Sequence, residues 1–153
     1  MREVPAAAVS LAKKHEGLHK IVRLQPLVTL APYVCPAGYW TIGYGHLCKK
    51  DQTPIDTAQA KAWLAEDMAD SAHAVCAYVP IWPTLTDGQF SALVDFVFNL
   101  GSGNFYASTL RRRINEGNFA DVPFQFSRWV YGGGKSLPGL VARRADEVRL
   151  WLN

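Results

Sequence analysis

A segment rich in proline, glycine, β-branched and aromatic residues interrupts an otherwise helical pattern in this chain of 153 residues. The segment covers residues 17–53, and its densest part, residues 40–46, reads WTIGYGH. Runs of this kind, punctuated by glycine, predict short strands joined by tight turns. We therefore expect a small β region close to the start of the chain.

Helical patterns flank the β region on both sides. Upstream, residues 5–16 carry an apolar stripe, with Pro5 at a first-turn position and Gly17 at the end. Thr86 and Gln89 have the spacing of a capping box. Downstream, apolar periodicity and terminating residues predict helices over residues 56–78, 86–100, 108–116, 119–130 and 138–152. A helix, a small β region and then several helices predict an α+β fold with its β part segregated into one lobe.

Composition agrees with a single domain over residues 1–153. Hydrophobic residues make up 49% of the chain, which is enough to build one well-filled core at this length. We expect a β-rich lobe at about residues 17–55 and a helical lobe from about 1–16 and 56–153. The net charge of +3 is mild. It suits a polyanionic partner such as a cell wall, but the basic run of Arg111, Arg112 and Arg113 equally suits a solvated helix face.

The cysteines indicate free thiols. Cys35, Cys48 and Cys76 cannot all pair with one another, and they lack a CxxC spacing, so a reducing compartment is expected. The first residues contain no apolar stretch long enough for a signal peptide before charged residues return at Lys13. We therefore expect no signal peptide.

One motif in the first helix points to a metal. His15, Glu16 and His19 match HExxH, in which two histidines one helical turn apart bind zinc and the glutamate acts as a base. The motif needs a continuing helix, yet Gly17 lies inside it and costs about 1 kcal/mol relative to alanine. It also needs a third ligand. A zinc hydrolase is therefore the less favoured alternative.

Glu16 is the last acidic residue before a long gap. No Asp or Glu occurs in residues 17–50, whereas glycosidic hydrolysis commonly uses two carboxyl groups. The segment instead contains Cys35, six positions before Thr41. The thiol could be a nucleophile, a base or hydrogen-bonding partner for water, or an inert buried group. Thr41 offers a hydroxyl that can orient water, or it only favours a strand.

The blocks HEGL, CPAGYWTIGYGH, FNLG, STLRRR and LPGLVARR resemble the phage-type lysozymes, the endolysin or muramidase family grouped as glycoside hydrolase family 24. The resemblance runs in order from Glu16 to Glu147 and implies a lysozyme-like fold. The family's catalytic triad is Glu, then Asp or Cys, then five residues, then Thr, which implies that Glu16, Cys35 and Thr41 are catalytic. Eighteen residues rather than about eight separate the first two members, so we expect an insertion within residues 20–31.

The resemblance also implies residues that bind the polysaccharide and orient the acid. Substrate binding is expected from Leu47, Phe98, Asn99 and Ser108, although Phe98 is equally compatible with core packing. Arg143 or Arg144 is expected to hold Glu16 in place. No cofactor and no metal are implied. We expect Trp63, Trp129 and Trp151 to be structural.

The function that the resemblance implies is that of an endolysin. Such an enzyme hydrolyses the bond between N-acetylmuramic acid and N-acetylglucosamine in bacterial peptidoglycan and so lyses the host cell. We expect a monomer in the host cytoplasm that reaches the periplasm with the indirect help of a holin, without binding nucleic acid or inserting stably into a membrane. The alternative from another class is a non-catalytic wall-binding or virion structural protein.

Overall fold

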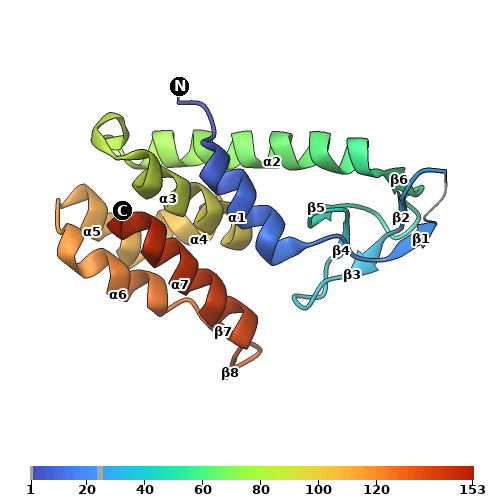
Figure 1. Ribbon diagram of the computed structural model, residues 1–153. Coiled ribbons are helices and arrows are strands. Elements are labelled where there is room, and N and C mark those ends of the chain that lie inside the picture. Colours follow the sequence, from blue (N-terminus) through green and yellow to red (C-terminus); the bar gives the residue numbers. More distant parts are fainter. Residues whose placement is uncertain (1, 24–25) are drawn as a thin grey trace. The chain divides into compact units, whose positions relative to one another are not determined.

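A computed structural model describes residues 2–23 and 26–153 of the protein (Figure 1). A helix, a group of short strands and a series of helices follow one another along the chain. This order confirms the predicted α+β, lysozyme-like fold. Within the described ranges, no helix combines the length and the apolar character needed to cross a membrane.

The long helices begin and end close to where the sequence predicts. They are α1 (Ala6–Glu16), α2 (Thr57–Tyr78), α3 (Asp87–Leu100) and α7 (Pro138–Leu152). At the start of α3, the N–H of Gln89 donates to Thr86 Oγ1 at 3.1 Å, and the N–H of Thr86 donates to Gln89 Oε1 at 3.0 Å. This is the predicted capping box, and it satisfies backbone donors that a helix start otherwise leaves free.

The chain between α3 and α7 is more broken than the sequence suggests. Instead of one helix over residues 119–130, it forms a 3-10 turn, η2 (Phe119–Asp121), and a short helix, α6 (Val122–Ser127). Pro123 lies in the first turn of α6, where its missing N–H costs nothing, so the helix restarts there. The remaining short elements are α4 (Ser102–Ala107), α5 (Thr109–Asn115), η1 (Trp82–Thr84) and the hairpin of β7 (Tyr131–Gly132) with β8 (Lys135–Ser136).

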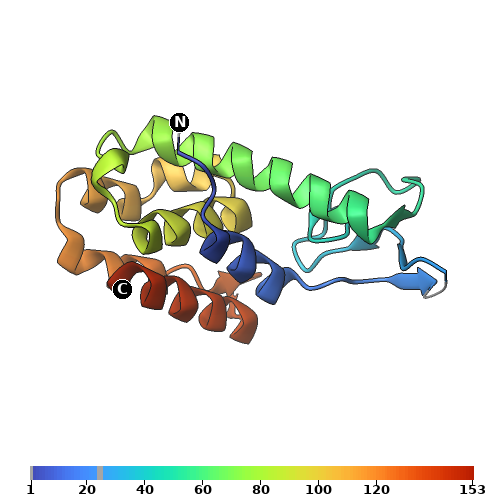
Figure 2. The same cartoon turned by 45° about the horizontal axis from the view of Figure 1, so that its top comes forward.

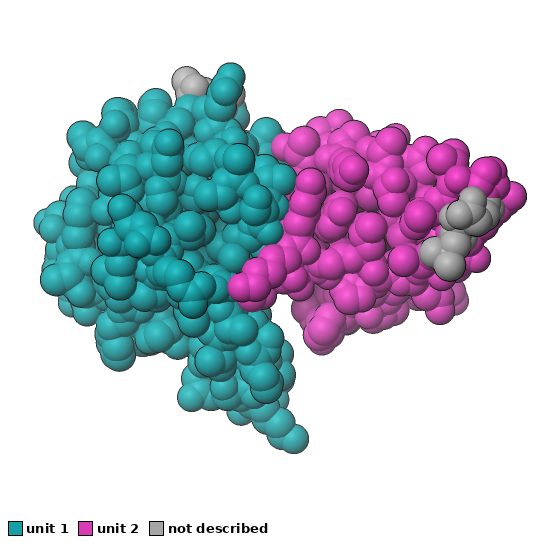
Figure 3. All heavy atoms as spheres, viewed as in Figure 1, with its two compact units in different colours: residues 1–11, 68–153 teal, residues 12–67 magenta. Residues whose placement is uncertain are grey.

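The chain divides into two compact units, which Figure 3 distinguishes by colour. Unit 1 comprises residues 1–11 and 68–153, and unit 2 comprises residues 12–67. In unit 1, α3 is the central helix, since residues 90–97 are all buried. Helix α7 packs beside it (Figure 2), and α4 also contacts it. The core of unit 1 is partly aromatic, with Phe96 in edge contact with Phe105, Phe126 and Trp129.

Unit 2 holds two small antiparallel sheets. One has the order β1 (Ile21–Arg23), β2 (Thr29–Leu30) and β6 (Ile55–Asp56), and the other β3 (Tyr33–Val34), β4 (Trp40–Ile42) and β5 (His46–Leu47). Their shared core consists of Leu30, Ile42, Ile55 and Ala60. The expected insertion, residues 20–31, supplies β1 and β2, while its residues 24–25 lie outside the described part of the chain.

Candidate active site

The sheet β3-β4-β5 decides which way the candidate catalytic side chains point. Tyr33 pairs directly with Thr41, and the N–H of Cys35 extends this ladder by donating to the carbonyl of Tyr39 at 2.9 Å. Ile42 is fully buried in the core of unit 2, so its neighbour Thr41 points to the opposite face. Because side chains alternate along a strand, Tyr33, Cys35 and Thr41 share that face.

The loop between β3 and β4 explains why Cys35 is held in this register. The N–H of Gly38 donates to the carbonyl of Cys35 at 2.8 Å, and Gly38 has φ +87°. A three-residue hairpin loop that ends with a glycine in the left-handed region is a common way to join two strands. The thiol is therefore fixed at the end of β3, and it is partly exposed, while Thr41 is only 3% exposed.

Glu16 is the last residue of α1, and two glycines define its position. Gly17, with φ +63°, ends the helix directly after it. Gly45, in the turn between β4 and β5, lies so close that a Cβ placed on it would be 3.0 Å from Glu16 Oε2. One turn earlier, Lys13 Nζ lies 5.9 Å from the ring centre of Tyr44. The end of α1 is therefore packed against the β4–β5 turn.

All three candidate catalytic residues affect the pKa of the Tyr33 phenol. Burial raises the pKa of Tyr33 from its ordinary value of 10.0, and a side-chain hydrogen bond with Thr41 acts in the opposite direction. The charges of Glu16 and Cys35 raise the pKa of Tyr33 further, as does that of Cys48. Glu16, Cys35 and Thr41 therefore all lie close enough to the Tyr33 phenol to affect its pKa.

The geometry of the HExxH motif does not suit zinc. Helix α1 ends at Glu16, so His15 and His19 do not occupy consecutive turns of one helix. The ring of His19 instead packs against that of Tyr33, with centroids 5.0 Å apart. Among residues 2–23 and 26–153, no group of three or more His, Cys, Asp or Glu side chains is arranged to hold a metal ion.

A contact between an imidazole and a carboxylate next to the site was not predicted from the sequence. His46 Nδ1 lies 2.9 Å from Asp67 Oδ2, and both side chains are about 30% exposed. The imidazole also stacks on the indole of Trp63, with ring centroids 4.4 Å apart. His46 belongs to the WTIGYGH block and directly follows Gly45, so this pair fixes the turn that faces Glu16.

The residues expected to bind substrate lie in both units. Leu47, on β5 of unit 2, is 67% exposed, whereas Ser108 of unit 1 is buried and donates its hydroxyl to the carbonyl of Phe105 at 2.7 Å. Phe98 and Asn99 lie in the last turn of α3 and are partly buried. Their roles in binding remain predictions.

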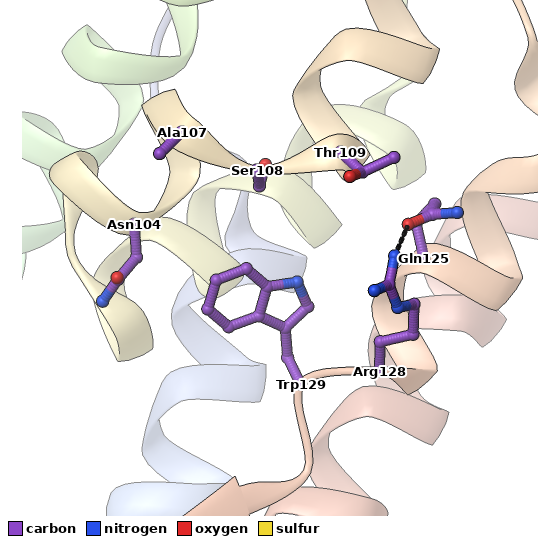
Figure 4. Close-up of a pocket in the computed structure, with 7 residues that line it drawn as sticks. All are labelled: Asn104, Ala107, Ser108, Thr109, Gln125, Arg128 and Trp129. Atoms are coloured by element: carbon purple, nitrogen blue, oxygen red, sulfur yellow. Dashed lines mark hydrogen bonds between the residues drawn. The ribbon is translucent and has the colours of Figure 1, made fainter.

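Ser108 also lines a pocket of about 350 Å³ in unit 1 (Figure 4). The indole of Trp129 forms one wall, and Arg128 donates to Gln125 Oε1 at 3.1 Å on another (Figure 4). The other lining residues are Asn104, Ala107 and Thr109. Trp129 was predicted to be structural, and it does pack on Phe96, at 5.4 Å between ring centroids. Nothing in the local sequence indicated that it also faces a pocket.

Arg143 and Arg144 are buried in unit 1, within a network of charged groups. Arg143 makes two hydrogen bonds to the carboxylate of Asp95, at 2.8 and 2.9 Å. Arg144 donates to Glu147 Oε1 at 2.6 Å and to Asn99 Oδ1 at 2.9 Å. Burial raises the pKa of Glu147 well above its ordinary value, and Arg144 opposes that effect. The expected role of either arginine in orienting Glu16 remains a prediction.

Comparisons with known proteins agree with these features. The family model described as "Phage lysozyme" matches residues 27–147. A SAR-endolysin of Enterobacteria phage PA-2 is 39% identical over 81% of this chain and 76% of its own length. An endolysin of Acyrthosiphon pisum secondary endosymbiont phage 1 is 34% identical over 92% of both chains.

Among solved structures, the muramidase domain of SpmX from Asticaccaulis excentricus superposes with a TM-score of 0.81 and 32% identity. That match covers 100% of this chain and 99% of the other. Since the family model spans most of the sequence and the relatives align over most of their own length, this chain belongs to the phage lysozyme family.

Proposed function

We propose that this protein is an endolysin that hydrolyses the bond between N-acetylmuramic acid and N-acetylglucosamine in peptidoglycan. The observation that carries the proposal is the shared face of β3 and β4, where Cys35 and Thr41 lie together. The Glu16 carboxylate belongs to the same unit, and its charge raises the pKa of Tyr33, the residue paired with Thr41. Hydrolysis of a glycosidic bond needs a proton donor and a second group that acts on the attacking water or on the sugar, and these residues offer such groups.

Glu16 is the general acid in this reaction. In its protonated form it gives its proton to the oxygen that leaves as the sugar bond breaks. Its place at the end of α1, against Gly45, restricts the positions that its carboxyl group can take. Pre-positioning of this kind lowers the barrier because less orientation is lost on reaching the transition state.

Cys35 and Thr41 act on the attacking water. The thiol group of Cys35, as thiolate, replaces the second carboxylate of the usual pair and accepts a proton from water as its oxygen bonds to the anomeric carbon. The hydroxyl of Thr41 accepts a hydrogen bond from the same water. The Glu16 carboxylate left after proton transfer then regains a proton, and the Cys35 thiol releases the proton that it took from water, which completes the cycle.

Each unit, taken by itself, carries groups that suit parts of the substrate in this proposal. Leu47 offers an exposed apolar side chain beside β4, which suits the face of a sugar ring. In unit 1, the pocket around Trp129 combines an indole with hydroxyl, amide and guanidinium groups. These groups match the acetamido and carboxyl groups of peptidoglycan. Phe98 and Asn99 complete the expected contacts.

The proposed site of action is the peptidoglycan of the periplasm. Several relatives are named SAR-endolysin and others endolysin. We propose that this protein, as a monomer, reaches the cell wall from the host cytoplasm with the indirect help of a holin.

The experiment that tests this function measures new reducing ends released from purified peptidoglycan. The unmodified protein should release them, and Glu16→Gln should reduce the rate by at least about 100-fold, because loss of a general acid has effects of this size. Glu3→Gln is the matched control, since Glu3 is exposed near the start of the chain. It should retain the full rate.

Two outcomes would contradict the proposal. Binding to peptidoglycan without new reducing ends would favour the non-catalytic alternative. Equal rates for Glu16→Gln and Glu3→Gln would remove Glu16 from the acid role. Mass spectrometry of the released fragments identifies the bond that is cut and distinguishes a hydrolysed sugar from an anhydro sugar.

A further inference from the structure

One hydrogen bond decides which end of the Asn99 amide is available to a bound molecule. Arg144 Nη2 donates to Asn99 Oδ1 at 2.9 Å. An arginine side chain has donors only, so the amide atom that faces it is the oxygen. The amide nitrogen lies on the other arm of the planar group and carries two hydrogens. Asn99 therefore directs hydrogen-bond donors away from Arg144.

The burial of these side chains indicates where the donors lie. Arg144 is 1% exposed and its neighbour Glu147 is fully buried, whereas Asn99 is half-buried. All three residues belong to unit 1, with Asn99 in the last turn of α3 and the other two on α7. Since the amide oxygen faces the buried side, the amide nitrogen lies toward the surface of unit 1.

Glu147 restricts the guanidinium that holds Asn99. Arg144 Nη2 also donates to Glu147 Oε1, at 2.6 Å, and the two residues lie one turn apart on α7. The two hydrogens of this one nitrogen are therefore shared between Glu147 and Asn99. The guanidinium carbon lies 5.0 Å from the centre of the Phe96 ring. These contacts fix the guanidinium and, through it, the Asn99 amide.

Stability alone does not account for the buried pair of Arg144 and Glu147. Two further nitrogens of Arg144, Nε and Nη1, are buried and have no hydrogen-bond partner among the residues that the structure describes. Buried donors without partners cost free energy, and a buried ion pair can often be replaced by well-packed apolar side chains without loss of stability. Apolar side chains could not, however, hold the amide of Asn99.

We infer that Arg144 and Glu147 are positioning residues, which hold the Asn99 amide with its Nδ2 group toward the substrate. In this orientation, Asn99 donates a hydrogen bond to the carbonyl oxygen of an acetamido group of peptidoglycan. The inference rests on the proposed function and deepens it, because it assigns Asn99 the role of a donor and names the residues that keep it in that role.

The first test is Asn99→Asp, which keeps the contact with Arg144 but replaces the donor by an acceptor. We expect KM for soluble peptidoglycan fragments to rise roughly three- to tenfold, because one hydrogen bond to the substrate is lost. The value of kcat should stay native, since that bond serves the bound substrate and the transition state equally. The melting temperature should not fall, because a carboxylate still accepts from Arg144.

Asn118→Asp is the matched control for the added negative charge. Asn118 is exposed in unit 1, and its side chain makes no capping hydrogen bond. This variant should keep the native KM. A native KM in Asn99→Asp would overturn the inference, because a purely structural role of Asn99 needs only the oxygen that faces Arg144.

The second test replaces the buried pair by apolar residues, Arg144→Met together with Glu147→Leu. KM should rise as much as in Asn99→Ala, and adding Asn99→Ala to the double variant should cause no further rise. Arg149→Met is the control, since Arg149 is an exposed arginine on the same helix, and it should keep the native KM. Additive effects of Asn99→Ala and the double variant would contradict positioning through the pair.

A third comparison isolates Glu147. Glu147→Leu removes the oxygen that accepts from Arg144, so KM should rise, whereas Glu147→Gln retains an oxygen there and should restore the native KM. Both variants are compared below their melting temperatures. Equal KM values for the Leu and Gln variants would exclude Glu147 from the positioning role.

The proposed function is tested separately. Release of reducing ends by the unmodified protein, and its loss in Glu16→Gln, decide whether the protein is a glycosidase. A glycosidase that keeps its native KM in Asn99→Asp contradicts only the inference about Asn99 and the pair behind it.

Discussion

Gly45 lies against the carboxylate of Glu16, and a Cβ at Gly45 would be 3.0 Å from Glu16 Oε2. This distance is tighter than nine in ten contacts of real Cβ atoms, so a larger residue requires the carboxylate to shift by a few tenths of an ångström. Gly45 also has φ +83°, a conformation that disfavours side chains. Gly45 is therefore needed because it has no side chain and because its backbone can adopt this conformation.

Gly45→Ala should lower both stability and activity. The strained backbone should cost about 1 to 2 kcal/mol of the free energy of unfolding, and the displaced Glu16 should reduce the rate of wall hydrolysis about tenfold or more. Gly117→Ala is the matched control, because Gly117 has φ +73° but nothing within 4 Å of an added Cβ. It should lose similar stability and keep the native rate. Equal rates in the two variants would contradict the role of Gly45 in placing Glu16.

Asp67→Asn should destabilise the protein by about 1 kcal/mol, because it removes the charged partner of His46 at a half-buried site. Chemical denaturation at neutral pH and low salt measures this loss. Asp70→Asn, at an exposed position on the same helix, serves as the control and should leave the midpoint unchanged. If Asp70→Asn destabilises the protein as much as Asp67→Asn, the loss of a negative charge on the helix, and not the loss of the contact with His46, explains the effect.

Cys35→Ala should reduce the release of reducing ends about 100-fold, whereas Cys35→Asp should remain active, because a carboxylate can take the place of the thiolate. Cys76→Ala, on α2, controls for the loss of a partly buried thiol and should be fully active. If Cys35→Ala hydrolyses walls at the native rate, the thiol has no catalytic role. Alkylation of a variant that lacks Cys48 and Cys76 provides an independent test, since it modifies Cys35 alone.

The stability of the protein should depend on pH through Glu147. Burial raises the pKa of Glu147 above the 4.5 that it has when unfolded. Its contribution to stability is therefore fully present below pH 4.5 and is lost as the pH rises through its folded pKa. Glu147→Gln removes this dependence, so its melting temperature should rise relative to the unmodified protein as the pH increases above 4.5.

The control for this effect is Glu66→Gln, because Glu66 is an exposed carboxylate on α2. Its melting temperature should follow that of the unmodified protein at each pH. A constant difference between Glu147→Gln and the unmodified protein from pH 4 to pH 8 would show that the buried carboxyl does not titrate in this range.

Features determined by neighbouring residues were predictable from the sequence. The capping box at Thr86 is one example, since it needs only a threonine and a glutamine three positions apart. The end of α1 at Glu16 is another, because Gly17 takes a conformation that other residues avoid. The prediction of one helix over residues 119–130 was wrong, because the apolar spacing did not show that a 3-10 turn precedes a new, shorter helix with Pro123 in its first turn.

The face of β4 on which Thr41 lies was decided by tertiary structure. Residues 40–46 predict strands and turns, but the burial of Ile42 in the core of unit 2 directs Thr41 to the side of Cys35. The sequence therefore identified the candidates for catalysis, whereas their common face depended on packing.

By itself, the sequence determined the helices, the small β region, the family and the three candidate catalytic residues, because these depend on local patterns and on short motifs. Only the tertiary structure decided which groups surround them. The contact of Gly45 with Glu16, the pairing of His46 with Asp67 and the place of Tyr33 beside Thr41 join different elements of unit 2. Such contacts form only when those elements pack around their shared core, and spacing along the chain does not encode them.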